Sequence, residues 1–426
     1  MHIFTIIYYK IFFILQFKII YSHIIIPFKN NLDILSLTEN NYVDKLFALN
    51  ITTNFSLGTP FQTIPFSIKL RQFHLIVLSE DSEDGKKIKS FNQNNSNSFF
   101  SKYNLPEYLD LPELEFGKKS YDIFKIENNI IEEFNFLLGY DSYYNQSAIL
   151  GLKNNDFYVN YSFIYQLKNR KYINSSIFYF KFSENNFNEG EIIIGNYPHE
   201  IEKNKYKYES YQTIGIITTK YTLYYDIYIT KITIGDKIIA EKKILQFYFE
   251  SYFMRFPFTF KEIVEKEFFN NLIENHKCSF FKHNLKEFFF YICDDDINIK
   301  KLKKLEFHSK ELNFTFSFKP EELFMKIKDK FIFLICFNSK KYEEEFAFGY
   351  FFLQKYLIIF EQERKVIGFY KINKTSYSYS WILTILFGII IIGLIYYIFL
   401  ILKKKRKIRA NELEDNFEYL PQKNIL

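Results

Sequence analysis

The residue types that most often carry chemistry are few in this chain and do not form a familiar site. Its seven histidines are scattered without the spacing of a metal site, and no glycine-rich phosphate loop occurs. Cys278, next to Lys277 and His276, is expected to be a surface thiol or one half of a disulfide. No cofactor and no metal ion are therefore expected.

The N-terminal segment indicates entry into the secretory pathway. Residues 1–21 are apolar apart from His2, Lys10, Gln16 and Lys18, and the uninterrupted apolar runs are too short for a membrane span. We expect a signal peptide over residues 1–22. Because the lysines divide the segment and no small-residue cleavage motif is evident, an N-terminal membrane anchor remains the alternative.

The other end of the chain predicts a transmembrane helix. Residues 381–402 form an uncharged apolar run, which spans about 33 Å as a helix and matches a hydrocarbon core of roughly 30 Å. Lysines and arginines follow at once, so residues 403–426 are expected in the cytosol. The topology expected is a single-pass type I membrane protein whose preceding part is lumenal or extracellular, connected through a linker at 373–380.

The charge distribution argues against a nucleic-acid partner. The formal net charge is +6, and six cations lie directly after the apolar run. The rest of the chain is neutral by count, so it has no basic surplus for binding phosphate backbones. These six cations are Lys403, Lys404, Lys405, Arg406, Lys407 and Arg409.

Cysteines and sequons agree with an oxidising compartment. Three cysteines lie in the part expected to be lumenal, where disulfides persist, and one bridge with one further thiol is the simplest arrangement. Several N-x-S/T sequons also occur, although a chain this rich in asparagine produces some by chance. The sequons begin at Asn50, Asn54, Asn94, Asn145, Asn160, Asn174, Asn313 and Asn373.

The segment between the two apolar ends reads as strands and turns. Residues 221–234 alternate β-branched or aromatic residues with polar ones before Gly235, which is typical of a hairpin. Residues 177–182 and 191–194 predict a second hairpin, and 261–273 predict a helix after Pro257. With many strands and no alternation of strands and helices, we expect an all-β architecture. About 340 residues suit two lobes better than one.

Five short motifs of the first half follow one another in a fixed order. They are Phe55–Gln62 (FSLGTPFQ), Leu75–Ser79 (LIVLS), Phe91 and Asn92 with Ser96, Ser98 and Phe99, Ala148–Leu152 (AILGL) and Glu189–Gly195 (EGEIIIG). In this order they resemble the G-T-P-x-Q, L-W-V-P-S, F-N-P-x-x-S-S-T-F, G-I-L-G-L and G-G-E-L-x-L-G motifs of the pepsin-like aspartic peptidases.

The second half repeats this order. Lys231–Ala240 resembles the hairpin before the second active-site loop of the family, and Phe346–Leu353 (FAFGYFFL) with Tyr356, Phe360 and Val366–Phe369 resembles the closing motifs. The resemblance covers about residues 43–372. It implies a two-lobed acid-protease fold with an interlobe cleft, an N-terminal lobe over 43–205 and a C-terminal lobe over 206–372.

The family's catalytic aspartates are missing at the matching positions. Each lobe of the family supplies one aspartate in a D-T/S-G loop, and the two carboxylates share a proton to activate water. The first loop falls on Lys69, Leu70 and Arg71, and no Asp or Glu occurs anywhere from residue 57 to residue 79. The first carboxylate is therefore absent.

The second loop falls on Tyr248, Phe249 and Glu250, the last of these in the glycine position. Glu250 is the only acid between residues 244 and 261, so a rearranged loop with Glu250 as a lone carboxylate is the alternative. The flap of the family is matched by Phe116 and Gly117 in a hairpin expected to be shortened, where Phe116 cannot donate a tyrosine hydroxyl.

By the same resemblance, Cys293 and Cys336 are expected to form the disulfide of the second lobe, with Cys278 to Cys293 as the alternative pairing. The bridge Cys293–Cys336 would close a long loop and contribute roughly 4 kcal/mol in chain-entropy models.

The resemblance and the missing dyad together imply a pseudopeptidase. The leading hypothesis is a membrane-tethered fold that binds polypeptide in its cleft or has a structural role, with Lys69 and Arg71 favouring an acidic ligand if each buried cation finds a partner. An active aspartic endopeptidase with a rearranged site is the second hypothesis. A surface adhesion or inhibitor protein that uses the outer faces of the lobes is the third.

Overall fold

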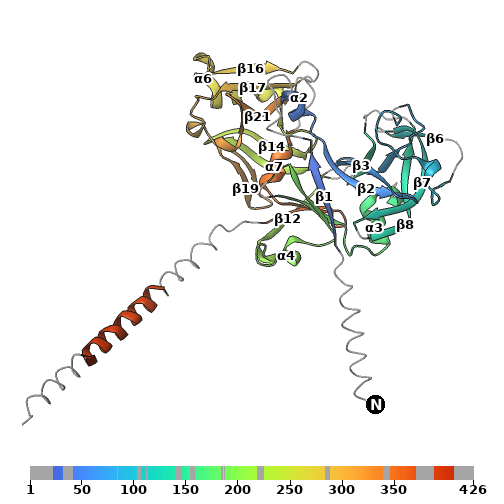
Figure 1. Ribbon diagram of the computed structural model, residues 1–426. Coiled ribbons are helices and arrows are strands. Elements are labelled where there is room, and N and C mark those ends of the chain that lie inside the picture. The colour runs from blue at the N-terminus through green and yellow to red at the C-terminus, as the bar shows by residue number, and fades with distance from the viewer. Residues whose placement is uncertain are drawn as a thin grey trace, which may run out of the picture. The chain divides into compact units, whose positions relative to one another are not determined.

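The computed structural model divides the chain into two compact units, residues 1–371 and 372–426. It describes residues 23–31, 42–83, 85–102, 107–111, 114–127, 129–140, 146–153, 159–183, 186, 188–217, 225–283, 288–338, 346–370 and 388–406. The first unit contains two large β-sheets (Figure 1). This confirms a mainly β architecture.

The first sheet has 14 strands and runs from β12 through β1 and β3 to β5, with β6 paired to β7. Its strands in sheet order are β12 (Tyr211–Gly215), β24 (Val366–Tyr370), β23 (Ile358–Glu361), β10 (Ile177–Phe182), β11 (Glu189–Ile194), β1 (Ile24–Asn30), β2 (Ile51–Leu57), β3 (Gln62–Lys69), β9 (Ala148–Gly151), β4 (Leu75–Leu78), β8 (Asn129–Gly139), β7 (Leu114–Ile126), β5 (Phe100–Ser101) and β6 (Glu107–Leu111).

The second sheet has ten strands and is built from the later part of the chain, with β20 paired to β21. Its strands in sheet order are β16 (Cys278–Lys282), β17 (Phe288–Asp294), β21 (Lys330–Asn338), β15 (Met254–Pro257), β22 (Phe346–Phe348), β14 (Lys237–Phe247), β13 (Ile227–Ile234), β18 (Leu305–Ser309), β19 (Phe314–Phe318) and β20 (Phe324–Ile327).

Both sheets contain the same six-strand arrangement. The order β2-β3-β9-β4-β8-β7 in the first sheet matches β13-β14-β22-β15-β21-β17 in the second. In each, the third strand of the series is parallel to one neighbour and antiparallel to the other, and the next pair is parallel again. The chain therefore folds one topology twice, and Figure 1 shows β2, β3, β7 and β8 in one group and β14, β17 and β21 in another.

A six-strand portion of the first sheet brings distant parts of the chain together. It consists of β12, β24, β23, β10, β11 and β1, so it combines the first strand, the middle and the last strands of the unit. The strand β1 pairs with β11 from Ile24 to Lys29. The strands of this unit thus begin before the predicted lobe boundary at residue 43. The sequence does not separate β1 from the apolar N-terminal segment, because both consist largely of apolar residues without a distinct periodicity.

The helices of the first unit are short and lie between strands. The predicted helix after Pro257 is confirmed as a continuous helical segment made of α5 (Lys261–Val264), η6 (Glu265–Phe269) and α6 (Asn270–Glu274). The others are α2 (Tyr42–Phe47), η2 (Gln93–Asn95), η3 (Val159–Tyr161), α3 (Phe163–Asn169), α4 (Pro198–Ile201), η4 (Tyr208–Ser210), η5 (Phe258–Phe260), η7 (Ile299–Lys301), η8 (Pro320–Glu322) and α7 (Tyr350–Lys355).

Strand formation follows from burial of aromatic and β-branched side chains. β2 alternates buried and less buried positions along its length, as expected for a strand with one face in the core. The strands β4, β9 and β22 lie inside the sheets with a neighbour on each side. They are buried at every position, which explains their continuous apolar sequences. Both predicted hairpins are confirmed, β13 with β14 and β10 with β11.

The disulfide joins Cys278 to Cys293, so the predicted Cys293–Cys336 bridge is wrong and the alternative pairing is confirmed. Cys278 and Cys293 lie directly opposite each other on the antiparallel strands β16 and β17, where Cβ atoms are close enough to bridge. Cys336 on β21 instead lies opposite Phe290. It is buried and takes no part in the bridge.

The second unit is helical over residues 388–406. Residues 381–387 of the predicted transmembrane span lie outside the described residues, as do the predicted signal peptide 1–22, the linker 373–380 and the tail after residue 406. Among the helices that the structure describes, none combines the length and apolarity needed to cross a membrane.

Candidate functional site: the junction of two equivalent loops

The repeated topology makes the loop after β3 equivalent to the loop after β14. Ile149 of β9 lies beside Ser67 and Ile76, and Ala347 of β22 lies beside Gln246 and Arg255 in the same way. Counting forward two residues from Ser67 and from Gln246 leads to Lys69 and Tyr248. The strand register therefore pairs Lys69, Leu70 and Arg71 with Tyr248, Phe249 and Glu250.

One glycine packs against each loop. Gly151 is the last residue of β9, and Gly349 directly follows β22. A Cβ atom on Gly151 would lie 2.6 Å from the His74 carbonyl oxygen, and one on Gly349 would lie 2.2 Å from the Phe253 carbonyl oxygen. His74 and Phe253 occupy matching places in the two loops. Only glycine allows this backbone approach, which gives a physical reason for the A-I-L-G and F-A-F-G sequences.

A buried cation at the start of the first loop has its partner in the second loop. Lys69 is 7% exposed, and its Nζ lies 3.4 Å from Oε1 of Glu250. The other carboxylate oxygen of Glu250 accepts a hydrogen bond of 3.2 Å from the Tyr248 hydroxyl. One carboxylate thus serves a buried ammonium group and a phenol, which offsets part of the cost of burying Lys69.

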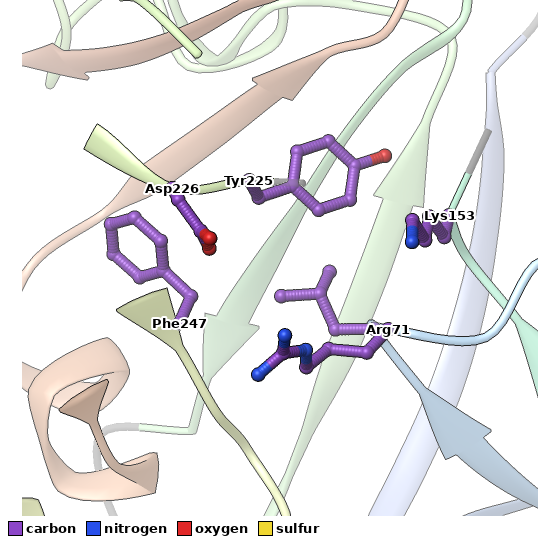
Figure 2. Close-up of a pocket in the computed structure, with 6 residues that line it drawn as sticks. Arg71, Lys153, Tyr225, Asp226 and Phe247 are labelled. Atoms are coloured by element: carbon purple, nitrogen blue, oxygen red, sulfur yellow. The ribbon is translucent and has the colours of Figure 1, made fainter. Parts of the chain in front are cut away.

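A second contact joins the two loops beside this ion pair. The Arg71 guanidinium donates to the Gln246 side-chain oxygen over 2.7 Å. A cavity of about 10 Å³ adjoins it, which has room for about one water molecule. Figure 2 shows the Arg71 guanidinium and the Asp226 carboxylate directed into the same space, with Lys153, Tyr225 and Phe247 around it.

Aromatic and cationic groups close the second loop from its other side. The Arg255 guanidinium lies 3.6 Å from the Tyr248 ring centroid and 4.9 Å from that of Phe288, distances at which cation–π attraction is effective. Burial raises the pKa of Tyr248, and the positive charge of Arg255 opposes that shift. Tyr248 therefore remains a neutral phenol that donates to Glu250.

Buried polar contacts also fix the strands behind the junction. The Tyr225 hydroxyl donates to the Leu152 carbonyl oxygen over 3.0 Å, and the Gln362 side chain donates to the same oxygen over 2.7 Å. Leu152 follows Gly151, and its backbone N–H donates to the Lys69 carbonyl oxygen. The first loop is therefore held by residues from β9, from the segment before β13 and from the segment after β23.

The predicted flap residues lie on a hairpin of the first half. Phe116 and Gly117 belong to β7 and pair with Tyr108 and Glu107 of β6. Phe116 is 43% exposed. Lys69, Tyr248 and Glu250 are in mutual contact through Glu250, and Arg71 contacts the second half through Gln246. Phe249 instead packs against Phe180 and Phe360, and Phe116 and Gly117 belong to a separate hairpin.

The junction can hold charge but lacks the groups for carboxylate-dyad chemistry. Lys69, Tyr248 and Glu250 provide an ammonium, a phenol and one carboxylate; a shared proton between two carboxylates needs a second acid. Within the described ranges, no cluster of three His, Cys, Asp or Glu side chains could hold a metal ion.

Sequence reasoning did not identify four residues of this junction, namely Gln246, Arg255, Lys153 and Asp226. Gln246 is a polar residue within the buried, otherwise apolar end of β14, and Arg255 lies inside the short strand β15, whose other residues are apolar. Polar residues in such places are a usable signal, because burial without a partner is costly. Comparison with protein-family models and with curated proteins finds no match for this chain.

Proposed function

We propose that this chain is a non-hydrolytic pepsin-like protein: a two-lobed acid-protease fold with an interlobe cleft whose former catalytic loops are joined by an ion pair. The repeated strand order in the two halves supports this fold, as does the six-strand portion that combines the first, middle and last strands. The ordered sequence motifs fall on matching strands and loops of the two halves. Glycines 151 and 349, in equivalent places, add a further point of agreement.

The observation that carries the proposal is the contact between Lys69 and Glu250. These residues stand in equivalent loops, where the family has two carboxylates that share a proton. An ammonium–carboxylate pair leaves no carboxylate available as general base beside a second one that is protonated. Peptide-bond hydrolysis by the aspartic mechanism is therefore lost.

The same contacts change the expectation about an acidic ligand. Lys69 and Arg71 both have acceptors from the other half, Glu250 and Gln246. Both cations therefore already have partners within the protein, and the adjoining cavity has room for only about one water molecule. A polypeptide held in the cleft would therefore lie above this junction, and a structural role for the joined halves fits the contacts equally well.

The alternative function is an active endopeptidase in which Glu250 acts alone. Glu250 is the sole acid in its loop, and its side chain is 30% exposed. Both of its oxygens already have partners, Lys69 and Tyr248. The matching first loop has no acid, so no second carboxylate stands at the matching place to polarise the scissile carbonyl, which favours the non-hydrolytic proposal.

Hydrolysis is tested directly with the purified full chain. We expect no cleavage of a denatured protein substrate between pH 3 and pH 6, with or without a statine-type inhibitor. The matched variant is Glu250→Gln, which keeps a hydrogen-bond acceptor for Tyr248 and removes the charge. Inhibitor-sensitive cleavage by the unchanged chain that disappears in this variant would overturn the proposal in favour of the active endopeptidase.

We further propose that the chain is a type I membrane protein of the secretory pathway. The Cys278–Cys293 disulfide supports an oxidising compartment, and five sequon asparagines, at positions 54, 94, 160, 174 and 313, are exposed as glycosylation requires. We expect a glycosidase-sensitive increase in mass and resistance to carbonate extraction from membranes. A chain without glycans that is released by carbonate would contradict this localisation.

A further inference from the structure

An open hollow of about 650 Å³ lies on the first half, between the turn after β2 and the loop around η2. Seven of its eight lining residues are polar, so its surface differs from the apolar lining of most small-molecule pockets. Three lining residues, Pro60, Gln62 and Asn92, belong to motifs of the first half, whereas none of the lining residues belongs to the loop junction. We therefore expect any ligand of this hollow to be polar.

The framework of the hollow is fixed by internal hydrogen bonds. The Gln62 side chain donates to the Asn92 carbonyl oxygen over 2.8 Å and accepts from the Asn92 backbone N–H over 2.9 Å. The Asn92 side chain accepts from the backbone N–H groups of Asn94 and Asn95. The hollow is thus ordered before any ligand arrives, which lowers the entropy lost on binding.

Hydrogen bonds to the buried Asp122 also fix the loop that follows η2. Ser96 donates to one oxygen of the buried Asp122 carboxylate over 2.8 Å, and Ser98 donates to the other over 2.5 Å. The backbone N–H of Thr59 donates to Ser96 Oγ over 3.1 Å. These bonds hold the loop from η2 to Ser98 against the turn after β2.

Four side chains remain available at the surface of the hollow, those of Glu80, Asn94, Asn95 and Asn97. All four residues are exposed. Within the part of the chain that the structure describes, these four side chains have no hydrogen-bond partner. They provide three amides, each a donor and an acceptor, and one carboxylate that accepts.

The lining excludes several ligand classes. Among the described residues, the lining contains no lysine or arginine to bind phosphate or carboxylate, and no aromatic ring on which a base could stack. One carboxylate is too few for a calcium site of ordinary ligand number. Neighbouring hydroxyl groups, each a donor and an acceptor, match the amides and the carboxylate.

We propose that this hollow is a saccharide-binding site formed by Glu80, Asn94, Asn95 and Asn97. Two sources could supply the saccharide. Asn94 begins a sequon completed by Ser96, so a glycan attached to Asn94 could fill the hollow; otherwise a free saccharide binds there. Both sources use the amides of Asn95 and Asn97 and the carboxylate of Glu80, whereas the Asn94 amide contacts a free saccharide only, because it carries the attached glycan in the other case.

The test uses the full chain in detergent, as the unchanged protein and as Asn94→Gln, which removes the sequon and keeps an amide. The probes are N,N′-diacetylchitobiose, methyl α-mannoside and cellobiose, titrated by calorimetry. In the Asn94→Gln chain, Asn95→Ala with Asn97→Ala removes two of the amides. Asn298→Ala is the matched control, because Asn298 is exposed and its side chain caps nothing at η7.

We expect at least one probe to bind the Asn94→Gln chain with a Kd of about 1 mM, weakened about tenfold or more by the paired alanines, and unchanged in Asn298→Ala. Binding by the unchanged chain as well indicates a free saccharide, and binding only after Asn94→Gln indicates that its own glycan fills the site. No binding of any probe, or equal binding by the paired alanine variant with an unchanged unfolding temperature, overturns the proposal.

Discussion

The loops after β3 and β14 share a backbone arrangement but differ in chemistry. The strand before each loop pairs in parallel with a buried strand, β9 or β22. A glycine at the end of that buried strand approaches the loop backbone. The first loop carries Lys69 and Arg71, whereas the second carries Tyr248 and Glu250. The comparison indicates that packing of glycine and strand maintains the loop geometry, while side chains of opposite charge at different loop positions, Lys69 and Glu250, join the two loops.

Replacing either glycine should break the shared geometry and have the largest effect. We expect Gly349→Ala to lower the free energy of unfolding by about 4 kcal/mol, because its Cβ would meet a backbone oxygen at 2.2 Å. Gly151→Ala, with a closest contact of 2.6 Å, should cost somewhat less. Urea unfolding measures both.

Gly215→Ala is the matched control, since a Cβ there meets nothing within 4 Å. A change within about 0.5 kcal/mol is expected for it. If Gly349→Ala behaved like this control, the glycines would not be what holds the two loops.

The two halves differ in covalent stabilisation, because all three cysteines, and so the disulfide, lie in the second half. Cys278→Ala with Cys293→Ala should lower the free energy of unfolding by about 3 kcal/mol, the chain-entropy value for a loop of this length. Unreduced peptide mapping should link Cys278 to Cys293. A peptide containing Cys336 in the linked product would contradict the hairpin register.

The two members of the ion pair should respond unequally to removal. Lys69 has a side chain 9% exposed, against 30% for Glu250, so Glu250→Gln leaves the more deeply buried charge without its counter-ion. We expect about 2 kcal/mol for Glu250→Gln and about 1 kcal/mol for Lys69→Met, below the values for fully buried pairs. Urea unfolding of both variants checks the order, and a larger cost for Lys69→Met would contradict it.

Acid should reduce the contribution of the first loop to the free energy of unfolding more than that of the second loop. Burial lowers the pKa of His74 to about 3, whereas the matching residue of the second loop is Phe253. The unfolded chain, with a histidine pKa near 6.5, binds the proton first, so stability is complete above that pH and falls as the pH decreases toward about 3. The slope due to His74 is at most about 1.4 kcal/mol per pH unit.

His74→Gln should remove this part of the acid dependence, as measured by urea unfolding from pH 7 to pH 4. An unchanged slope would show that His74 is not the source. His308, also with a pKa lowered by burial, is retained in this variant and provides the background.

The sequence predicts local structure here better than contacts between distant segments. Gly235 and the alternating residues on both sides of it give a hairpin, and the apolar runs around Gly151 and Gly349 give buried strands, because these depend on neighbours in the chain. The equivalence of Lys69 and Tyr248 also follows from motif spacing. The Lys69–Glu250 contact does not, because it depends on how the two halves pack.

The disulfide illustrates the same limit. Motif order favours Cys293 with Cys336, but the choice depends on which strand lies opposite Cys293, and β16 places Cys278 there. Strand β1 also escapes prediction, since its apolar residues continue from the N-terminal run. Pairing partners, unlike turns, are set by tertiary packing.

The central claim is that a charge pair, Lys69 with Glu250, joins the two equivalent loops, and a double-mutant cycle tests it most directly. Urea unfolding of the unchanged chain, Lys69→Met, Glu250→Gln and the double variant gives the coupling energy. We predict a favourable coupling of about 1.5 kcal/mol, with the double variant costing less than the two single variants together. Additive effects, within about 0.5 kcal/mol, would contradict the account.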